Sequence, residues 1–523
     1  MIVEGTTLPA GAKLDADVCV VGAGPAGIAI AGELSGRGIA VTVLESGGRR
    51  ASLRGQLLLG GRSVGYPYPR LPLAAVSAFG GSSHRWGPYW HARPLDALDF
   101  EERPEVPGSG WPFPRAALVP YYVRAERLLG LEPFDYEAGT AERDASRLLP
   151  VRAGRLVLGE LRHGHADYRR AYERLAAAGD VRVILGAHVG ELLPGGADAV
   201  AGVRAWVAPR RAFTVRAKVT VLAAGGIGNA RLLLLGNAAN PEGIGNRHDL
   251  VGRFFMEHLA VRSGVVALHD PALLARRDLF GVGATPGGGA AVRTLALSEE
   301  VVRAEGLLNT YVMLEPRPRA FAAEGVRSAS AFARALRSQP LTARFPAQAA
   351  RAALAAPAVA RALAARRPEI LVVRVQAEQA PSPDSRVTLE PGVNRFGIRK
   401  ARLDWRIAEA DRRSIRRTQE LVGAELEAAG LGRFEDLLGD ERPPLLVAGH
   451  YHHLGTTRMH PDPERGVVDA AGRVHGVDNL YVTGGSVFPT GGAANPTLTV
   501  VALALRLADE LQRVLGAGGQ PVQ

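Results

Sequence analysis

The apolar residues near the N-terminus are arranged as one βαβ unit. The run 17–21 is short, continuous and rich in β-branched residues, which is typical of a buried strand. A glycine-rich turn, Gly22-Ala23-Gly24-Pro25-Ala26-Gly27, follows it and leads into an apolar helical stretch that extends to about Ser35. The run 39–44 predicts a second buried strand that ends at Glu45.

Apolar periodicity predicts further strands and helices along the rest of the chain. Strands are expected at 181–187, 200–215, 219–222 and 371–389, and helices from near Asn229, at 411–429 and from Pro496 to Leu511. In the last of these, Asn495 suits the N-cap and Pro496 the first helical position, where a missing N–H has no cost. Buried strands alternating with helices predict an α/β fold.

Composition narrows the class of protein. With 523 residues, of which 47% are hydrophobic, the chain can bury a large core, and its one cysteine, Cys19, is expected to be a small buried hydrophobe. There is no signal-peptide pattern and no apolar run of the ~18 residues that cross a bilayer, so a cytoplasmic protein, at most peripheral to a membrane, is expected.

The charge is strongly basic, at +11, and only three of the 63 basic residues are lysines. Such a surface favours acidic substrates, an acidic partner or anionic lipid. Nucleic acid is a poor fit, because the arginines are mostly scattered and no recognition motif is present.

The first glycine motif carries the clearest chemistry. Gly22 allows a tight turn, Gly24 lets the backbone approach a pyrophosphate, and Gly27 lets the helix pack closely on the strand. The diphosphate would lie on the helix N-terminus. Glu45 lies 18 residues after Gly27, where a carboxylate can accept hydrogen bonds from ribose hydroxyls and would repel a 2′-phosphate. The sequence therefore predicts a dinucleotide site.

Other motifs resemble, in the same order, those of the glucose–methanol–choline (GMC) family of FAD enzymes. They are Phe79-Gly80-Gly81-Ser82-Ser83-His84-Arg85-Trp86-Gly87, Ala223 to Leu235, Val251 to His258, Tyr451 to Met459, Asn479 to Pro489 and Asn495-Pro496-Thr497-Leu498-Thr499. The resemblance spans nearly the whole chain and implies FAD as the cofactor.

The resemblance also implies an architecture. A Rossmann-like FAD-binding domain would be discontinuous and formed by residues 1–95, 180–260 and 445–523. Residues 96–179 and 261–444 would form a substrate-binding domain, built on an antiparallel sheet with covering helices.

The family pattern assigns cofactor-binding positions beyond the first glycine motif. The loop with Gly81, Ser82, Ser83 and Trp86 would lie against the flavin and pyrophosphate, and the backbone of Val189 would meet the adenine. The remaining positions expected at the cofactor are Gly225, Gly485, Ser486, Pro496 and Thr497. The helix that begins near Pro496 would direct its positive end at the pyrimidine edge of the flavin.

Two departures from the family pattern concern the flavin. An acidic residue that is common near Gly484 is missing. Some relatives attach flavin through a histidine at the position that Arg85 occupies here, and His84 lies one place away. Non-covalent FAD is therefore favoured.

Candidate catalytic residues come from the C-terminal motifs. Oxidation of an alcohol needs a largely neutral base for the hydroxyl proton, which suits histidine. The family pattern places that base three residues before Gly455, at His452, with His453 as the alternative. The second catalytic position is Asn495, which would orient the substrate oxygen, although it would instead cap the last helix in the simpler interpretation. No zinc-like ligand spacing surrounds the histidines, so no metal is expected.

These observations favour an FAD-dependent enzyme that oxidises the CH–OH group of a sugar-like or polyol alcohol. The alternatives are a lyase of the cyanohydrin type and a non-catalytic flavoprotein at a membrane surface. The electron acceptor, whether oxygen, quinone or protein, stays open.

The segment 326–368 has eight arginines and no Asp, Glu or Lys. Short solvated helices with their apolar faces packed on the body are favoured there. A lid over the active site and a contact with a membrane or an acidic partner are the alternatives.

Overall fold

The fold is described from a computed structural model of the 523-residue chain. The structure describes all residues except 87–89, 138–142, 166–167, 197, 237, 277–278, 286–287, 323–325, 327–328, 330–331, 334–335, 340–344, 365–366, 439–447 and 517–523.

An eight-stranded sheet is formed by segments that are far apart in the chain. Its order is β1 (Ile2–Glu4), β8 (Val181–Leu185), β3 (Val41–Glu45), β2 (Lys13–Val21), β11 (Arg211–Leu222), β10 (Val200–Ala208) and β9 (His188–Pro194), with β22 (Leu480–Val482) also paired to β11. The strands from β1 to β11 and β22 are parallel, whereas β9, β10 and β11 form an antiparallel meander.

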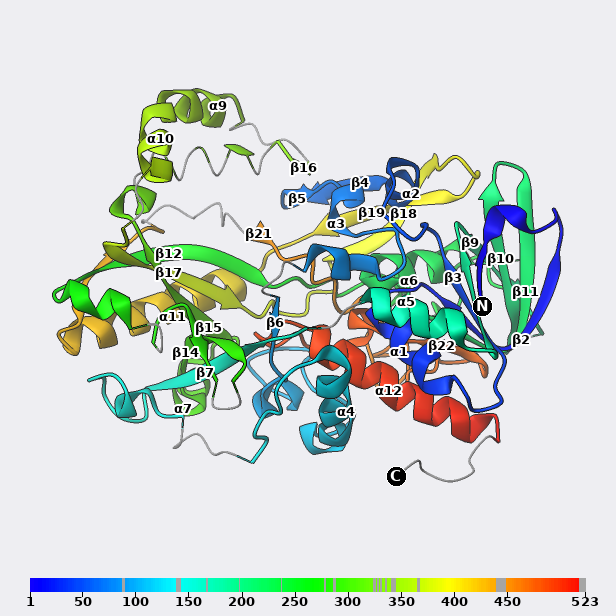
Figure 1. Ribbon diagram of the computed structural model, residues 1–523, viewed down its shortest axis with the longest axis horizontal. Helices are drawn as coiled ribbons and strands as arrows, with labels where there is room; N and C mark the ends of the chain where they lie inside the picture. The colour runs from blue at the N-terminus through cyan, green and yellow to red at the C-terminus, as the bar shows by residue number, and fades with distance from the viewer. Residues whose placement is uncertain are drawn as a thin grey trace.

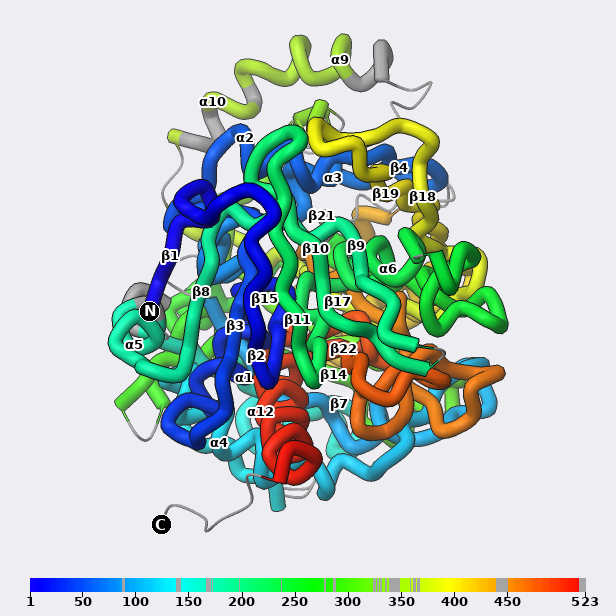
Figure 2. Tube along the Cα trace, turned by 90° about the vertical axis from the view of Figure 1, so that its right-hand side faces the viewer, coloured from blue at the N-terminus to red at the C-terminus, as the bar shows by residue number. Residues whose placement is uncertain are grey.

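Helices from both ends of the chain pack beside this sheet. The helix α1 (Pro25–Leu34) packs against α12 (Thr497–Val514), which also contacts α4 (Val119–Leu129). In Figure 1 the blue α1 and the red α12 lie side by side, and Figure 2 shows both below the strands β2 and β3. The helices α5 (Tyr168–Ala177) and α6 (Gly225–Leu235) contact β8 and β9 respectively.

A second, nine-stranded sheet is antiparallel throughout. Its order is β20 (Gly432–Asp436), β12 (Leu259–Leu268), β17 (Ile370–Ala377), β15 (Thr310–Arg317), β14 (Ala290–Leu297), β7 (Leu156–His163) and β6 (His91–Ala92). Two short strands extend it, β13 (Val282–Ala284) beside β14 and β21 (Ala448–Gly449) beside β12. The helix α11 (Glu409–Ala428) packs on β17 and β20, and α7 (Glu299–Glu305) follows β14.

Smaller elements complete the fold. A three-stranded sheet contains β18 (Arg386–Val393), β19 (Arg399–Trp405) and β4 (Gly61–Gly65), and β5 (Tyr68–Pro69) pairs with β16 (Ser338–Gln339). The short helices are α2 (Leu53–Gln56), α3 (Leu71–Ala74), α9 (Phe345–Leu354) and α10 (Ala356–Ala364). The α/β class, with a Rossmann-like part and an antiparallel sheet, is confirmed, while the exact domain boundaries stay a prediction.

Four predicted elements differ from the observed ones. The run 200–215 is not one strand, because the chain reverses at Arg210, whose φ is +61°, and β11 continues to Leu222. The run 371–389 contains the separate strands β17 and β18, which belong to different sheets. The helix expected near Asn229 begins at Gly225. The last helix begins at Thr497 with Pro496 as its N-cap, so Asn495 is outside it.

The arginine-rich segment 326–368 is only partly within the described residues. Figure 1 shows α9 and α10 above the rest of the molecule, and α10 contacts the short helical turn Arg319–Ala322. Leu354 is 84% exposed, so the prediction that this residue packs on the body is wrong. Nearby, the backbone N–H of Arg70 donates to the carbonyl of Arg337 (2.9 Å), next to the β5–β16 pair.

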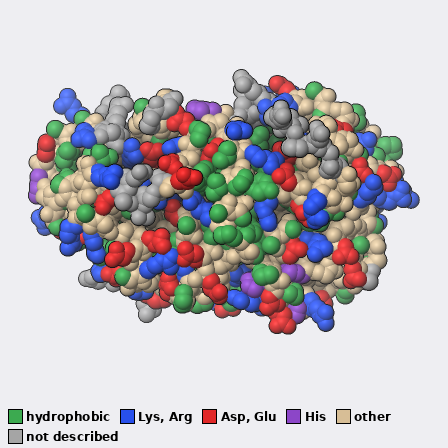
Figure 3. Space-filling model, turned by 90° about the horizontal axis from the view of Figure 1, so that it is seen from below, with side chains coloured by type: hydrophobic (Ala, Val, Ile, Leu, Met, Phe, Trp, Pro, Cys, Tyr) green, Lys and Arg blue, Asp and Glu red, His purple; other side chains and the backbone are tan. Residues whose placement is uncertain are grey.

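Burial agrees with the expectation for the cysteine. Cys19 is completely buried, which raises the pKa of its thiol to about 12. In the described part of the chain, no helix is both long and apolar enough to cross a membrane. On the face shown in Figure 3, basic and acidic side chains are interspersed around a central group of apolar ones.

Candidate active site

The first glycine motif folds as a tight turn between β2 and α1. Gly22 has φ of +108°, and a Cβ on it would lie 2.6 Å from the carbonyl oxygen of Ala223. A Cβ on Gly27 would lie 2.0 Å from the Gly22 oxygen, so helix and strand pack too closely for a side chain. At Gly24, by contrast, a Cβ would meet no described atom within 4 Å. The turn thus leaves open space at the residue that precedes the helix N-terminus.

Glu45 is held against this turn. Its carboxylate accepts hydrogen bonds from the backbone N–H groups of Ala23 (3.0 Å) and Gly47 (2.8 Å). Burial raises the pKa of Glu45 to about 7, although these hydrogen bonds oppose the shift. The carboxyl group is therefore at the end of β3, beside the glycine turn, as the motif predicts.

The second glycine-rich loop docks on the first. The N–H of Gly80 donates to the carbonyl of Ala23 (2.7 Å), and a Cβ on Gly81 would lie 2.9 Å from the Cα of Gly24. Ser83 closes the loop by donating its hydroxyl to the Gly80 carbonyl (2.7 Å). Ser82 and Trp86, in the same short helical loop, are both half-buried.

Asn229 joins two segments that are far apart in the chain, a role that sequence reasoning missed. Its Oδ1 accepts from the N–H of Ala224 (2.8 Å), and its Nδ2 donates to the Thr483 carbonyl (3.1 Å) and the Ser486 hydroxyl (2.9 Å). The turn at Gly225 is therefore tied to Ser486. The signal was the polar Asn229 within a mostly apolar helix, where it is completely buried.

The other predicted cofactor positions are distributed around the same region. Val189 is buried in β9, at the edge of the eight-stranded sheet. Gly485 packs against Leu454, so closely that a Cβ would lie 2.7 Å from its Cδ2. Thr497 begins α12, next to Pro496.

An FAD group fits these residues for two reasons. The space at Gly24 adjoins the N-terminus of α1, where unpaired N–H groups and the helix dipole favour a diphosphate. Glu45 supplies a carboxylate at the end of the adjacent strand, with the position and spacing suited to a ribose.

His452 has a hydrogen-bonded partner that selects its tautomer. The Nδ1 atoms of His452 and His258 are 2.7 Å apart, and Nε2 of His258 lies 2.8 Å from the carbonyl oxygen of Gly492. A carbonyl can only accept, so His258 carries its proton on Nε2. Burial lowers the pKa of His258 to about 4, and neutral His258 therefore accepts at Nδ1 from His452. This leaves a lone pair on Nε2 of His452.

His453 belongs to a different network. Its Nε2 lies 2.9 Å from the hydroxyl of Tyr68, which donates to Glu257 (2.6 Å). Glu257 also accepts from the backbone N–H groups of His452 (3.1 Å) and His258 (3.0 Å). Burial raises the pKa of Glu257 to about 7 and lowers that of His453 to about 4. Glu257 therefore links the backbone of His258 to that of His452.

His450, the fourth histidine in this region, lies next to the antiparallel sheet. Arg374 in β17 donates to Nε2 of His450 (3.0 Å), and the rings of His450 and His452 stack with centroids 5.5 Å apart. Burial lowers the pKa of His450 to about 3, and it lowers that of His452 well below 6.5. The histidine cluster, which consists of His258, His450, His452 and His453, is consequently uncharged at pH 7.

Asn495 is oriented by two carbonyl groups. Gln376 donates from Nε2 to the Ala493 carbonyl (2.9 Å) and to Oδ1 of Asn495 (3.1 Å). Nδ2 of Asn495 donates to the His91 carbonyl (3.0 Å). Because both carbonyls only accept, the two amide orientations are determined. The side chain does not cap α12, so the capping interpretation is wrong.

The loop residues at the candidate flavin-linking position have other partners. Nε2 of His84 lies 2.7 Å from the carbonyl of Phe79. Arg85 donates to the carbonyls of Leu73 and Ala75 and stacks over the ring of Tyr451 (4.9 Å). Among the described residues, no group of three or more His, Cys, Asp or Glu side chains is suited to a metal ion.

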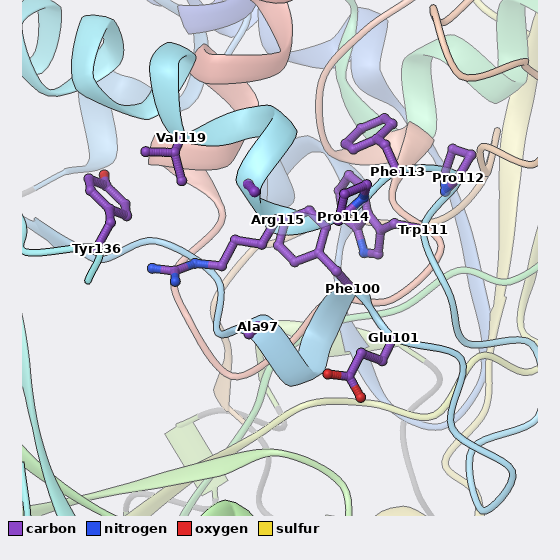
Figure 4. Close-up of a pocket in the computed structure, with 11 residues that line it drawn as sticks. Ala97, Phe100, Glu101, Trp111, Pro112, Phe113, Pro114, Arg115, Val119 and Tyr136 are labelled. Carbon is purple, nitrogen blue, oxygen red and sulfur yellow. The ribbon is translucent and has the colours of Figure 1, made fainter. Parts of the chain in front are cut away.

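A separate surface cavity of about 670 Å³ is lined by aromatic residues of the segment 97–136. Figure 4 shows Phe100, Trp111, Phe113, Arg115 and Tyr136 around it. Its lining includes none of the histidines described above, so the cavity is distinct from their cluster.

Comparison with known proteins indicates the class of protein. The family model described as GMC oxidoreductase matches residues 381–504, and the FAD binding domain model matches residues 15–57. The 6'''-hydroxyparomomycin C oxidase of Streptomyces lividus is 28% identical, over 96% of this chain and 92% of that protein. The 2-methyl-1,2-propanediol dehydrogenase of Mycolicibacterium austroafricanum is 27% identical, over 57% of this chain and 48% of that protein.

Solved structures show the same fold at low sequence identity. The pyridoxine 4-oxidase from Mesorbium loti superimposes with a TM-score of 0.57 and 19% identity, and the match covers 95% of this chain and 99% of that one. The R554A variant of formate oxidase from Aspergillus oryzae gives a TM-score of 0.56 and 18% identity, with 97% and 99% covered. The fold, the glycine turn with Glu45, and these matches together identify the class of protein as an FAD-dependent oxidoreductase. The matches support a GMC-type FAD protein, to whose family the chain is similar.

Proposed function

We propose that this enzyme oxidises the CH–OH group of a sugar-like or polyol alcohol to a carbonyl, with His452 as the base. Oxidation of an alcohol by an FAD enzyme is the general activity that the family assignment supports. Bound FAD supplies the hydride acceptor at its N5 atom. The observation that carries the proposal is the His258–His452 pair, which leaves an unprotonated Nε2 on the half-buried, neutral His452.

His452 takes the hydroxyl proton at Nε2 as the carbinol hydrogen departs as hydride. No described residue donates to or accepts from that nitrogen, and the side chain is half-buried, so it is available to a substrate. His258 acts as a positioning residue, because its Nδ1 keeps the other proton of His452 on the far side of the ring. Protonation of His452 strengthens this hydrogen bond, since the donor becomes charged.

Asn495 orients the alcohol oxygen. Its Oδ1 is occupied by Gln376 and one N–H by the carbonyl of His91, which leaves the second N–H of Nδ2 for the substrate. A neutral donor holds the oxygen without competing for its proton. Gly22, Gly24, Gly27 and Glu45 would hold the cofactor diphosphate and ribose.

The cofactor is proposed to be held without a covalent bond. Arg85 occupies the position of the linking histidine, and His84 uses its Nε2 within its own loop. Denaturation should therefore release the yellow colour into the supernatant, whereas colour in the precipitate would indicate a link.

The deciding experiment is an anaerobic screen of sugars and polyols in which the flavin absorbance is followed. Bleaching by an alcohol supports the proposal whatever the electron acceptor is. Cleavage of a cyanohydrin without bleaching would support the lyase alternative. No reaction with either class would favour the non-catalytic flavoprotein.

A further inference from the structure

The antiparallel sheet presents a line of polar side chains to the histidine cluster. Arg374 and Gln376 are two residues apart on β17, so both point to the same face of the sheet. Gln376 bonds Asn495, and Arg374 bonds His450. The partner strand β15 places Met313 and Tyr311 directly opposite, and both pack with Ala493. This face is therefore the side of the site that meets the substrate domain.

The hydrogen-bonding groups on this side are mostly donors. Because Arg374 donates to Nε2 of His450, neutral His450 carries its proton on Nδ1, which has no partner among the described residues. Asn495 offers one N–H, and Arg374 keeps further N–H groups. The lone pair of His452 is the acceptor for the reacting hydroxyl. Such a set matches a substrate with several oxygen atoms.

The charges on this side are mostly positive. Arg374 and Arg317 both pair with Glu315, at 3.4 and 3.0 Å, and Arg262 also lowers the pKa of this carboxyl. Arg262 lies directly across from Arg374 in the sheet register. Glu315 is thus already neutralised, and no carboxylate described on this face remains to pair with a substrate ammonium group.

We propose that Arg374 is a specificity residue that selects a sugar acid, by pairing its guanidinium with a carboxylate on the substrate. The inference rests on the proposed oxidation of a sugar-like alcohol and deepens it. Guanidinium groups bind carboxylates through two parallel hydrogen bonds, a geometry that neither a hydroxyl nor an ammonium group reproduces. Arg374 contacts His450, and the ring of His450 stacks on that of the base His452, so the carboxylate would bind close to the reacting hydroxyl.

The first test measures binding to the oxidised holoenzyme, so it does not need turnover. Gluconate, sorbitol and glucosamine are titrated in air while the flavin spectrum is followed. Gluconate should bind at least about ten-fold more tightly than sorbitol, and glucosamine more weakly than either. Arg374→Gln should remove the preference for gluconate. Equal affinities in the wild type, or an unchanged preference in this variant, would overturn the proposal.

Arg293→Gln is the matched control. Arg293 belongs to β14 of the same sheet and pairs with Glu160 (2.7 Å), but it alternates with Val292 and Thr294 and so points to the other face. Its replacement should leave the preference unchanged. Arg374→Lys keeps the charge without the planar fork and should retain only part of the selectivity.

The second test separates this inference from the proposed function. Matched neutral, carboxylate and ammonium sugars, such as methyl glucoside, methyl glucuronide and methyl glucosaminide, are used for anaerobic flavin reduction. If neutral sugars reduce the flavin and the sugar acid reduces it no faster, the role of Arg374 is wrong but the proposed oxidation still holds. If no alcohol reduces the flavin, the proposed oxidation itself fails, even where gluconate binds.

Discussion

The hydroxyl of Tyr68 lies 2.9 Å from Nε2 of His453 and donates its own proton to Glu257. The Tyr68 oxygen can therefore only accept from His453, whose Nε2 must carry a proton and cannot act as a base. His452 differs, because its partner His258 holds the proton on Nδ1. The two adjacent histidines are thus distinguished by their partners rather than by their positions in the chain.

Replacement of His452 by Ala should slow anaerobic flavin reduction by roughly 10²–10⁴, the usual effect of losing a positioned acid–base group. FAD content should stay unchanged, which is checked by absorbance after denaturation. His453→Ala is the matched variant and should cost much less in rate. The opposite ranking would move the base to His453.

Replacement of Asn495 should affect substrate orientation without affecting the helix that follows. Because the side chain does not cap α12, Asn495→Ala should change thermal stability little but reduce the rate of flavin reduction. Asn495→Asp should be slower still, since its carboxylate would repel the developing negative charge on the substrate oxygen and the reduced flavin. Full activity of Asn495→Ala would remove it from the mechanism.

The pH dependence should reflect the depressed pKa of His452. The base must be neutral, and the neutral form exists above the pKa, so burial shifts the loss of activity to a pH well below 6.5. The rate constant for flavin reduction should therefore be similar at pH 8 and pH 6, as measured by stopped flow. A decline centred at about 6.5 would contradict this, unless Glu257→Gln abolishes it and so assigns it to Glu257.

Local sequence patterns predicted the first glycine turn because its parts are contiguous. A strand, three glycines and a helix lie within Lys13–Leu34, and Gly22 and Gly27 each have a steric reason that the motif indicates. The pairs that define the catalytic cluster were not predictable. His258 and His452 are 194 residues apart, and Gln376 and Asn495 are 119 apart. Their tautomers and amide orientations depend on carbonyl groups that only the tertiary fold brings close.

The same reasoning explains the error at Asn495. Asn followed by Pro is a strong local signal for a helix start. Gln376 and the carbonyl of His91 outcompete the helix for the amide, and the helix begins two residues later, at Thr497.

The glycine turn offers a test that separates folding from cofactor binding. Gly24 has extended backbone angles and open space around its Cα, so Gly24→Ala should fold normally but bind FAD more weakly, because the methyl group would occupy the diphosphate position. Gly27→Ala should instead lower the yield of folded protein, as its Cβ overlaps the Gly22 carbonyl. Gly32→Ala, on the outer part of α1, is the control and should be neutral or slightly stabilising.

FAD affinity and melting temperature are measured on the apoprotein and after adding FAD. Unchanged FAD affinity in Gly24→Ala would show that the diphosphate does not lie at this turn. The prediction is independent of the substrate, so it holds even if the catalytic assignment fails.

The last prediction concerns the arginine-rich segment 326–368. Within its described part, Arg337 and Arg351 are exposed, as is Leu354, while Arg334 and Arg344 lie outside the described residues. Exposed arginines and an exposed leucine suit the surface of an anionic membrane, where each basic residue contributes ~1 kcal/mol. Binding to phosphatidylglycerol vesicles at low salt, and its loss at high salt, is the result expected of this interpretation.

Changing Arg334, Arg337, Arg344 and Arg351 to Gln should abolish that co-sedimentation. The control changes four exposed arginines elsewhere, Arg54, Arg62, Arg395 and Arg402, to Gln, which removes the same charge. Equal losses in both variants would indicate a general effect of net charge, and no binding by the wild type would remove the membrane interpretation. The pairing of β16 with β5, which carries Tyr68, also links this segment to the site. A change in flavin reduction only in the first variant would therefore support a lid, and unchanged reduction would leave solvated surface helices.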